Sequence, residues 1–144
     1  MFDYHAESET DIISAKEMFN INYFSCISLI NRFIKRGLTR VFFMNSISGI
    51  IPQVGQGQYS ASKHALQAYS EVLAKASVNN GFDVMNINPC GINSKLWKKT
   101  KILNNDVTEK FLDPKCLAKV VSTLLSLPKE TYIRSMVILP MNDV

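Results

Sequence analysis

The chain has 144 residues, of which 47% are hydrophobic and 19% charged, and its net charge is +4. This composition is typical of folded globular domains rather than disordered chains, and the length is enough for one domain with a sizeable core. The positive charges are scattered apart from a small cluster at Lys95, Lys98, Lys99 and Lys101, so we expect a solvated face there and no nucleic-acid partner.

The first half of the chain predicts a helix, a strand and a second helix. Residues 1–11 are polar and predict a loop, whereas residues 12–36 carry apolar residues at helical spacing up to a stop at Gly37. Residues 40–46 are short, apolar and aromatic, which is typical of a buried strand. A loop punctuated by glycine and proline follows, and residues 58–78 predict the second helix, which ends at the glycine of "NNG".

The second half of the chain continues the alternation. The segment "FDVMNINP" predicts a strand that its proline ends. Residues 90–112 are polar and irregular, with short helices expected around Trp97 and Thr108. Asp113-Pro114 is a favourable helix opening, for a helix that we expect to reach about Leu127, and "TYIRSMVILP" predicts a last strand.

Helices that alternate with strands indicate an α/β fold. Helices of this length allow parallel crossovers, so we expect about three parallel strands in a doubly wound sheet with helices on both faces. Ligands of such sheets bind beyond the carboxyl ends of the strands. The segments "MNSISG" and "NPCGINS", which follow the first two strands, are therefore the candidate site.

Three cysteines, Cys26, Cys90 and Cys116, stand far apart in the sequence. The odd number, the spacing and the absence of a C-x-x-C motif predict neither a disulfide framework nor a metal site, and they fit a reducing compartment. The N-terminal stretch is acidic and lacks the apolar core of a secretory signal, and no run approaches the ~18 apolar residues of a membrane span. We therefore expect a cytoplasmic location.

Tyr59 and Lys63 stand four residues apart, which places them on one face of the second helix. A tyrosine has a pKa of about 10, and a nearby ammonium would lower it, so that the phenol could exchange a proton with a carbonyl or alcohol oxygen. A chance Tyr–Lys pair is the alternative, because the spacing alone is a weak signal.

Two further polar residues accompany the pair. Ser46 lies just beyond the first strand, thirteen residues before Tyr59, where it could hold a substrate oxygen or simply bond its own backbone. Asn22 lies within the first helix and is either a surface amide or the anchor of a water near Lys63, with Asn20 as a neighbouring candidate.

The stretches "MNSISG", "QYSASKHAL" and "NINPCGINS" resemble the short-chain dehydrogenase/reductase family, and "MFNINYFS" resembles its asparagine-bearing helix. The resemblance implies Asn22, Ser46, Tyr59 and Lys63 as catalytic residues, and NADP or NAD as cofactor, with NADP slightly favoured. It implies that Tyr59 transfers the proton and Lys63 holds the nicotinamide ribose. The resemblance also implies a carbonyl or alcohol substrate, without a metal.

The resemblance also implies that the loop after the second strand lies against the nicotinamide, through Pro89, Gly91, Ile92 and Ser94. In the family pattern the backbone near Ile92 would bond the carboxamide. This loop departs from the family pattern at Cys90, where the family has glycine. Glycine permits close backbone approach, so the cysteine could shift the loop; a reactive-thiol role is the alternative.

The family's Gly-rich pyrophosphate turn and its N-N-A-G segment have no counterpart in this sequence. We therefore expect residues 1–144 to form a single incomplete Rossmann-like domain, the C-terminal part of such an enzyme, with an uncovered edge on the strand at 40–45. The rival hypothesis is an inactive fragment that serves as a scaffold or interaction subunit. In either case the helices at 12–36 and 58–78 are candidates for pairing across a homodimer.

Overall fold

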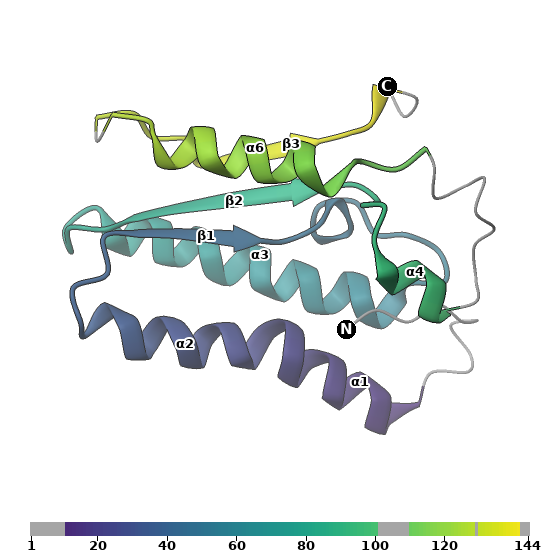
Figure 1. The fold of residues 1–144 in the computed structure, drawn as a ribbon. Coiled ribbons are helices and arrows are strands. Elements are labelled where there is room, and N and C mark those ends of the chain that lie inside the picture. The colour runs from purple at the N-terminus through teal and green to yellow at the C-terminus, as the bar shows by residue number, and fades with distance from the viewer. Residues whose placement is uncertain (1–10, 101–109, 129, 142–144) are drawn as a thin grey trace.

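A computed structural model describes residues 11–100, 110–128 and 130–141. The loop expected at 1–11, apart from Asp11, and the short helix expected around Thr108 lie outside these residues. The sheet contains β1 (Arg40–Met44), β2 (Asp83–Pro89) and β3 (Ser135–Ile138). All neighbours in the order β1-β2-β3 are parallel, which confirms the predicted sheet (Figure 1).

The helix expected at 12–36 has three parts. They are α1 (Ile12–Phe19), a π-helical turn η2 (Asn20–Phe24) and α2 (Ser25–Ile34). Asp11 caps α1, because its carboxylate accepts hydrogen bonds from the backbone of Ile13 and Ser14. The π-helical turn is a difference from the sequence prediction, and it adds one residue to the helix at the position of the candidate asparagine.

The other helices begin and end close to their predicted positions. They are α3 (Gly57–Ser77), α4 (Lys95–Thr100) and α6 (Pro114–Leu125), with a short 3₁₀ turn η3 (Ile47–Gly49) after β1. Asp113 caps α6 through the backbone N–H of Lys115, which confirms the predicted opening. Gly37 and Gly81 have φ values of 79° and 72°, the left-handed conformation expected where these glycines end helices.

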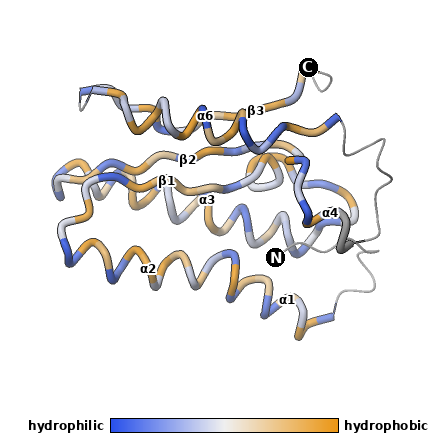
Figure 2. Tube along the Cα trace, viewed as in Figure 1, coloured by the Kyte–Doolittle hydropathy of each residue, from blue (hydrophilic) through white to orange (hydrophobic). Residues whose placement is uncertain are grey.

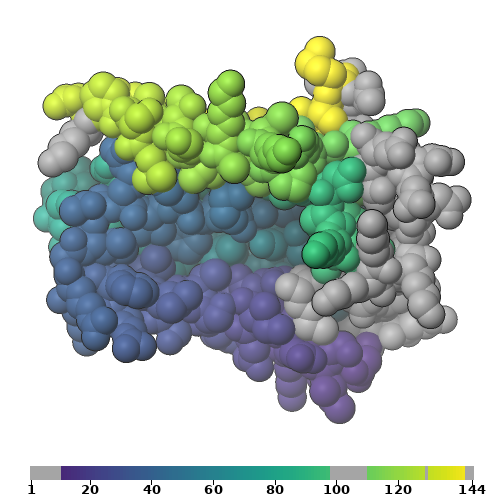
Figure 3. Space-filling view, in the orientation of Figure 1, coloured from purple at the N-terminus to yellow at the C-terminus, as the bar shows by residue number. Residues whose placement is uncertain are grey.

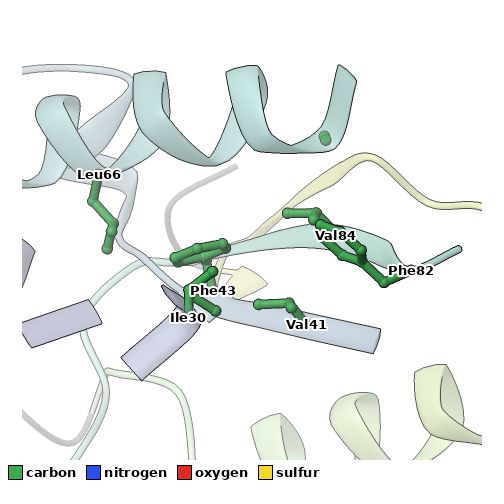
Figure 4. Packing of buried hydrophobic residues seen from close by; sticks show 7 residues of the cluster. Ile30, Val41, Phe43, Leu66, Phe82 and Val84 are labelled. Carbon is green, nitrogen blue, oxygen red and sulfur yellow. The ribbon is translucent and has the colours of Figure 1, made fainter. Parts of the chain in front are cut away.

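Helices cover both faces of the sheet, as a doubly wound fold requires. On one face α2 and α3 pack on β1 and β2 around buried residues that are labelled in Figure 4, namely Ile30, Val41, Phe43, Leu66, Phe82 and Val84. On the other face α6 packs around Ile87, Leu117 and Leu124, with Phe42 and Met136 beside them. The alternation along β1 assigns neighbouring side chains to opposite faces.

The amino ends of the strands are tied to α6 by one charged side chain. Arg40 Nη2 lies 2.9 Å from Asp83 Oδ2, and Arg40 Nη1 donates to the carbonyl of Leu124 at 3.2 Å. These bonds join β1, β2 and the end of α6. At the opposite end, the carboxyl ends of the strands continue into loops. The first turn of α3 and the short helix α4 also lie at this end of the sheet (Figure 1).

The strand β1 stands at the end of the strand order, so its outer edge pairs with no other strand among the described residues. In Figure 3 the molecule is viewed from the side on which the β1 region lies between α6 and α2. Within the described part of the chain, the strand at 40–45 is thus an edge strand, as predicted.

Candidate active site

The turn that follows β1 places Ser46 against the start of α3. Ser46 caps η3, with its Oγ accepting a hydrogen bond from the backbone N–H of Ser48 at 3.1 Å. The side chains of Ser46 and Tyr59 are hydrogen-bonded to each other. The structure therefore brings together two residues that are thirteen positions apart in the sequence.

Lys63 lies one helical turn after Tyr59 on α3. Its Nζ is 5.8 Å from the centroid of the Tyr59 ring, and it donates to the carbonyl of Met44 at 3.3 Å. The carbonyl of Met44 is the last one of β1. Lys63 thus links the helix that carries Tyr59 to the end of the strand that precedes Ser46.

The pKa values of the pair differ from the sequence expectation. Burial raises the pKa of Tyr59 above its usual 10.0, and the hydrogen bond with Ser46 opposes this shift. Burial also lowers the pKa of Lys63 below its usual 10.5, which Cys26 opposes. The net shift of the Tyr59 pKa is therefore opposite to the expected lowering, because burial disfavours the charged forms of both groups. Tyr59 therefore keeps its proton at neutral pH.

Asn22 is buried in the π-helical turn and contacts α3. Its Nδ2 donates to Ser62 Oγ at 3.1 Å, and Ser62 Oγ in turn donates to the carbonyl of Tyr59 at 2.8 Å. Its own carbonyl accepts a weak bond from Cys26 Sγ at 3.6 Å. Because Asn20 is exposed, the structure favours Asn22 as the asparagine that belongs with the Tyr59 segment.

The loop after β2 forms the opposite side of a cavity of about 370 Å³. Ser46 and Tyr59 line this cavity, and so do the four loop residues predicted from the sequence, Pro89, Gly91, Ile92 and Ser94. Asn22 and Lys63 are not among its lining residues. Cys90 also lines the cavity, and its backbone N–H donates to the carbonyl of Ile138.

Two aromatic side chains, Trp97 and Phe111, contact the loop after β2. Trp97 Nε1 donates to the carbonyl of Ile92 at 2.7 Å, and the rings of Trp97 and Phe111 have centroids 5.1 Å apart. A Cβ added to Gly91 would lie 2.7 Å from Phe111 Cδ1, so the ring occupies the space that a side chain would need. Trp97 therefore both packs on its neighbour and lines the cavity.

Sequence reasoning assigned no individual role to several residues of this region, among them Ser48, Gln56, Ser62 and Phe111. The first three were detectable in principle, because each stands two or three positions from a candidate residue and so within one turn of it. Phe111 had no such signal, because twenty residues separate it from the glycine on which it packs.

No three His, Cys, Asp or Glu side chains gather into a metal-binding group in the described part of the chain. Of the helices described, none is both long and apolar enough to cross a membrane.

Comparison with known proteins identifies the family. A sequence model of the short chain dehydrogenase family matches residues 4–104. The chain belongs to this family.

Individual relatives agree with this assignment. The chain is 31% identical over 105 residues to a probable short-chain type dehydrogenase/reductase, VdlC, of Helicobacter pylori, covering 68% of this chain and 37% of VdlC. It is 27% identical over 138 residues to dehydrogenase/reductase SDR family member 7 of Mus musculus, covering 87% of this chain and 41% of the mouse protein. The chain thus spans about two fifths of the length of these curated relatives.

Solved structures have a fold similar to that of this chain. An NADPH-bound short chain oxidoreductase from Pseudomonas aeruginosa PAO1, described as containing an atypical catalytic center, superposes with a TM-score of 0.84 at 14% identity. The match covers 98% of this chain and 62% of that protein. The described strands and helices therefore form part of the Rossmann-like fold of this family.

Proposed function

We propose that this chain supplies the substrate-binding and proton-transfer part of an NAD(P)-dependent dehydrogenase/reductase that acts on a carbonyl or alcohol substrate. The observation that carries the proposal is the hydrogen bond between Ser46 and Tyr59 at the wall of a cavity whose other side is the Pro89–Ser94 loop. Family membership supports the reaction class.

Each side chain has a role that its contacts support. Tyr59, protonated at neutral pH, gives its proton to the substrate oxygen during reduction and takes it back during oxidation. Ser46 donates to the same oxygen and positions it. Asn22 holds Ser62 against the Tyr59 carbonyl, so it positions the first turn of α3.

The cofactor proposed is NADP or NAD, and the described residues fit its nicotinamide end. When bound, the nicotinamide supplies or accepts the hydride. In this proposal Lys63, whose ammonium lies beside the Tyr59 ring, bonds the ribose hydroxyls. Ile92 and Ser94, which line the same cavity as Tyr59, lie against the nicotinamide. Trp97 Nε1 occupies the Ile92 carbonyl, so carboxamide binding there requires this bond to be shared or broken.

The decisive experiment is a titration of the purified chain with NADPH and NADH, followed by nicotinamide fluorescence, and then turnover of a panel of aldehydes and ketones. We expect Tyr59→Phe to lower kcat at least a hundredfold, because the proton donor is lost while the ring remains. The matched control is Tyr69→Phe on the same helix, since Tyr69 packs by its ring against Tyr23 and Phe43 and lies outside the cavity. Equal activity of the two variants would contradict the role of Tyr59.

The second candidate is an inactive interaction subunit. Exposed apolar side chains along α1, η2 and α2 favour it, namely Ile13, Ile21, Phe24, Leu29 and Phe33. Figure 2 shows hydrophobic and hydrophilic residues alternating along these helices. Together with α3 this surface is the proposed homodimer contact. A folded chain that binds neither nucleotide but sediments as a dimer would favour this candidate over the enzyme.

A further inference from the structure

Besides Ser46 and Tyr59, the cavity is lined by a second hydrogen-bonded pair of polar side chains, Ser48 and Gln56. Ser48 Oγ donates to Gln56 Oε1 at 3.2 Å. Ser48 is only 4% exposed, and its backbone N–H already bonds Ser46 Oγ. One serine therefore connects the candidate catalytic hydroxyl to the glutamine amide.

The backbone of Gln56 is held on both sides. Its N–H donates to the carbonyl of Gln53 at 3.1 Å, and its carbonyl accepts from the N–H of Ser60 at 2.7 Å, in the first turn of α3. With Oε1 engaged by Ser48, the amide presents its Nε2 donors, and none of the described residues accepts a bond from them. The glutamine is thus a fixed hydrogen-bond donor three residues before Tyr59.

The opposite wall differs in character. Leu96, Trp97 and Phe111 supply an aliphatic and aromatic surface, and none of the described residues that line the cavity carries a full charge. A carboxylate or phosphate substrate would find no counter-charge among the described residues of this wall, and desolvating it without a partner is costly. The cavity therefore suits a neutral compound with an apolar group and a second oxygen.

We propose that Gln56, held by Ser48, determines specificity by donating a hydrogen bond to a second oxygen of a neutral substrate, next to the carbonyl that Ser46 and Tyr59 bind. This inference rests on the proposed function for the position of the carbonyl. The substrate class is an oxygenated ketone whose apolar or aromatic group lies on Trp97 and Phe111.

Two ketones that differ by one hydroxyl test the proposal. They are acetophenone and 2-hydroxy-1-phenylethanone, and their binding to the full chain is titrated by saturation-transfer NMR without cofactor. We expect the hydroxyketone to bind about tenfold more tightly, as one neutral hydrogen bond allows. Gln56→Leu brings the affinity ratio close to one, and Ser48→Ala lowers it part of the way, because the amide is no longer oriented.

The matched control is Gln53→Leu. Gln53 lines the same cavity, but its Nε2 donates to the carbonyl of Ile51, so this variant keeps the affinity ratio. An equal loss of the ratio in both glutamine variants, no preference in the unmodified chain, or no binding of either ketone would each overturn the proposal. If Gln56→Leu fails to fold, Ser48→Ala and Gln56→Glu decide, because glutamate at this place accepts hydrogen bonds but cannot donate when ionised.

Turnover is measured in parallel with NADPH. A preference for the hydroxyketone in binding, without turnover of either ketone, contradicts the proposed function and leaves the role of Gln56 supported. Turnover that depends on Tyr59 but does not discriminate between the two ketones supports the proposed function and overturns the role of Gln56.

Discussion

At the scale of single residues, burial decides the ionisation of Tyr59 and Lys63. The pKa of Tyr59 is raised, so between about pH 10 and its folded pKa the folded chain binds more protons than the unfolded chain, and the free energy of unfolding falls with pH. The pKa of Lys63 is lowered, so below about pH 10.5 the folded chain binds fewer protons, and the free energy of unfolding rises with pH.

These two contributions predict opposite effects of two substitutions. Above about pH 10, the unmodified chain loses stability as pH rises, because the folded state favours the protonated Tyr59. The Tyr59→Phe variant has no such loss, so its free energy of unfolding rises relative to that of the unmodified chain. As pH rises towards about 10.5, the unmodified chain gains stability from Lys63. The Lys63→Met variant lacks this gain, so its free energy of unfolding falls relative to that of the unmodified chain. Urea unfolding from about pH 8 to about pH 11 measures both differences, and parallel curves for all three chains would contradict the pKa directions.

Gly91 has no room for a side chain, because the ring of Phe111 packs against it. The missing side chain is replaced by the ring of Phe111, so Gly91→Ala should destabilise the fold by about 1–3 kcal/mol through overpacking. Chemical denaturation measures this loss. The double variant Gly91→Ala/Phe111→Leu should recover part of it, because the smaller side chain leaves room for the added methyl group, and a simple sum of the two single effects would argue against the contact.

At the scale of elements, the π-helical turn is held by a serine on another helix. Ser62 is fully buried and accepts from Asn22 while it donates to the Tyr59 carbonyl. Ser62→Ala should lower the free energy of unfolding by about 1–3 kcal/mol, because it removes the acceptor of a buried amide.

A second buried serine on α3 is the control for this substitution. Ser77 donates only to the carbonyl of Ala74 within its own helix, so Ser77→Ala should cost less than Ser62→Ala. Urea unfolding gives both values, and NMR chemical shifts of η2 should move in the Ser62 variant alone. An equal cost for the two variants would mean that the bond to Asn22 adds nothing to the stability of α3.

The elements themselves were largely predictable from the sequence, for reasons that particular residues show. Asp113-Pro114 opens α6, Gly37 and Gly81 follow α2 and α3, and the apolar strand segments pair in parallel as the alternation of elements indicated. These features depend on neighbours in the sequence, where local backbone preferences act.

Features that depend on the packing of distant segments were not predictable in the same way. Apolar spacing along residues 12–34 tolerates one additional residue, so it did not reveal the π-helical turn at Asn22. The spacing of Tyr59 and Lys63 indicated an interaction but not the burial that raises the tyrosine pKa. The contact of Phe111 with Gly91 spans a segment without regular pattern.

At the scale of the whole molecule, three parallel strands form the sheet of the described residues. The chain spans about two fifths of the length of its curated relatives. The middle strand β2 is buried on both faces, while β1 pairs with β2 alone among the described strands. Tyr59, Ser46 and the loop after β2 all line one cavity at the carboxyl ends of these strands. The residues to which we assign the acid–base half of the proposed chemistry therefore lie close together in this chain.

The single-sided pairing of β1 has a consequence for amide hydrogen exchange. The N–H of Asn45 donates to Ile87 on β2, and since successive amides of a strand point to alternate sides, those of Val41 and Phe43 also point to β2. The amides of Phe42 and Met44 then point to the open edge, and we expect them to exchange with deuterium much faster than their two neighbours. Equal protection of all four would mean that this edge is covered in solution, so the exchange of these four amides reports whether the outer edge of β1 is paired.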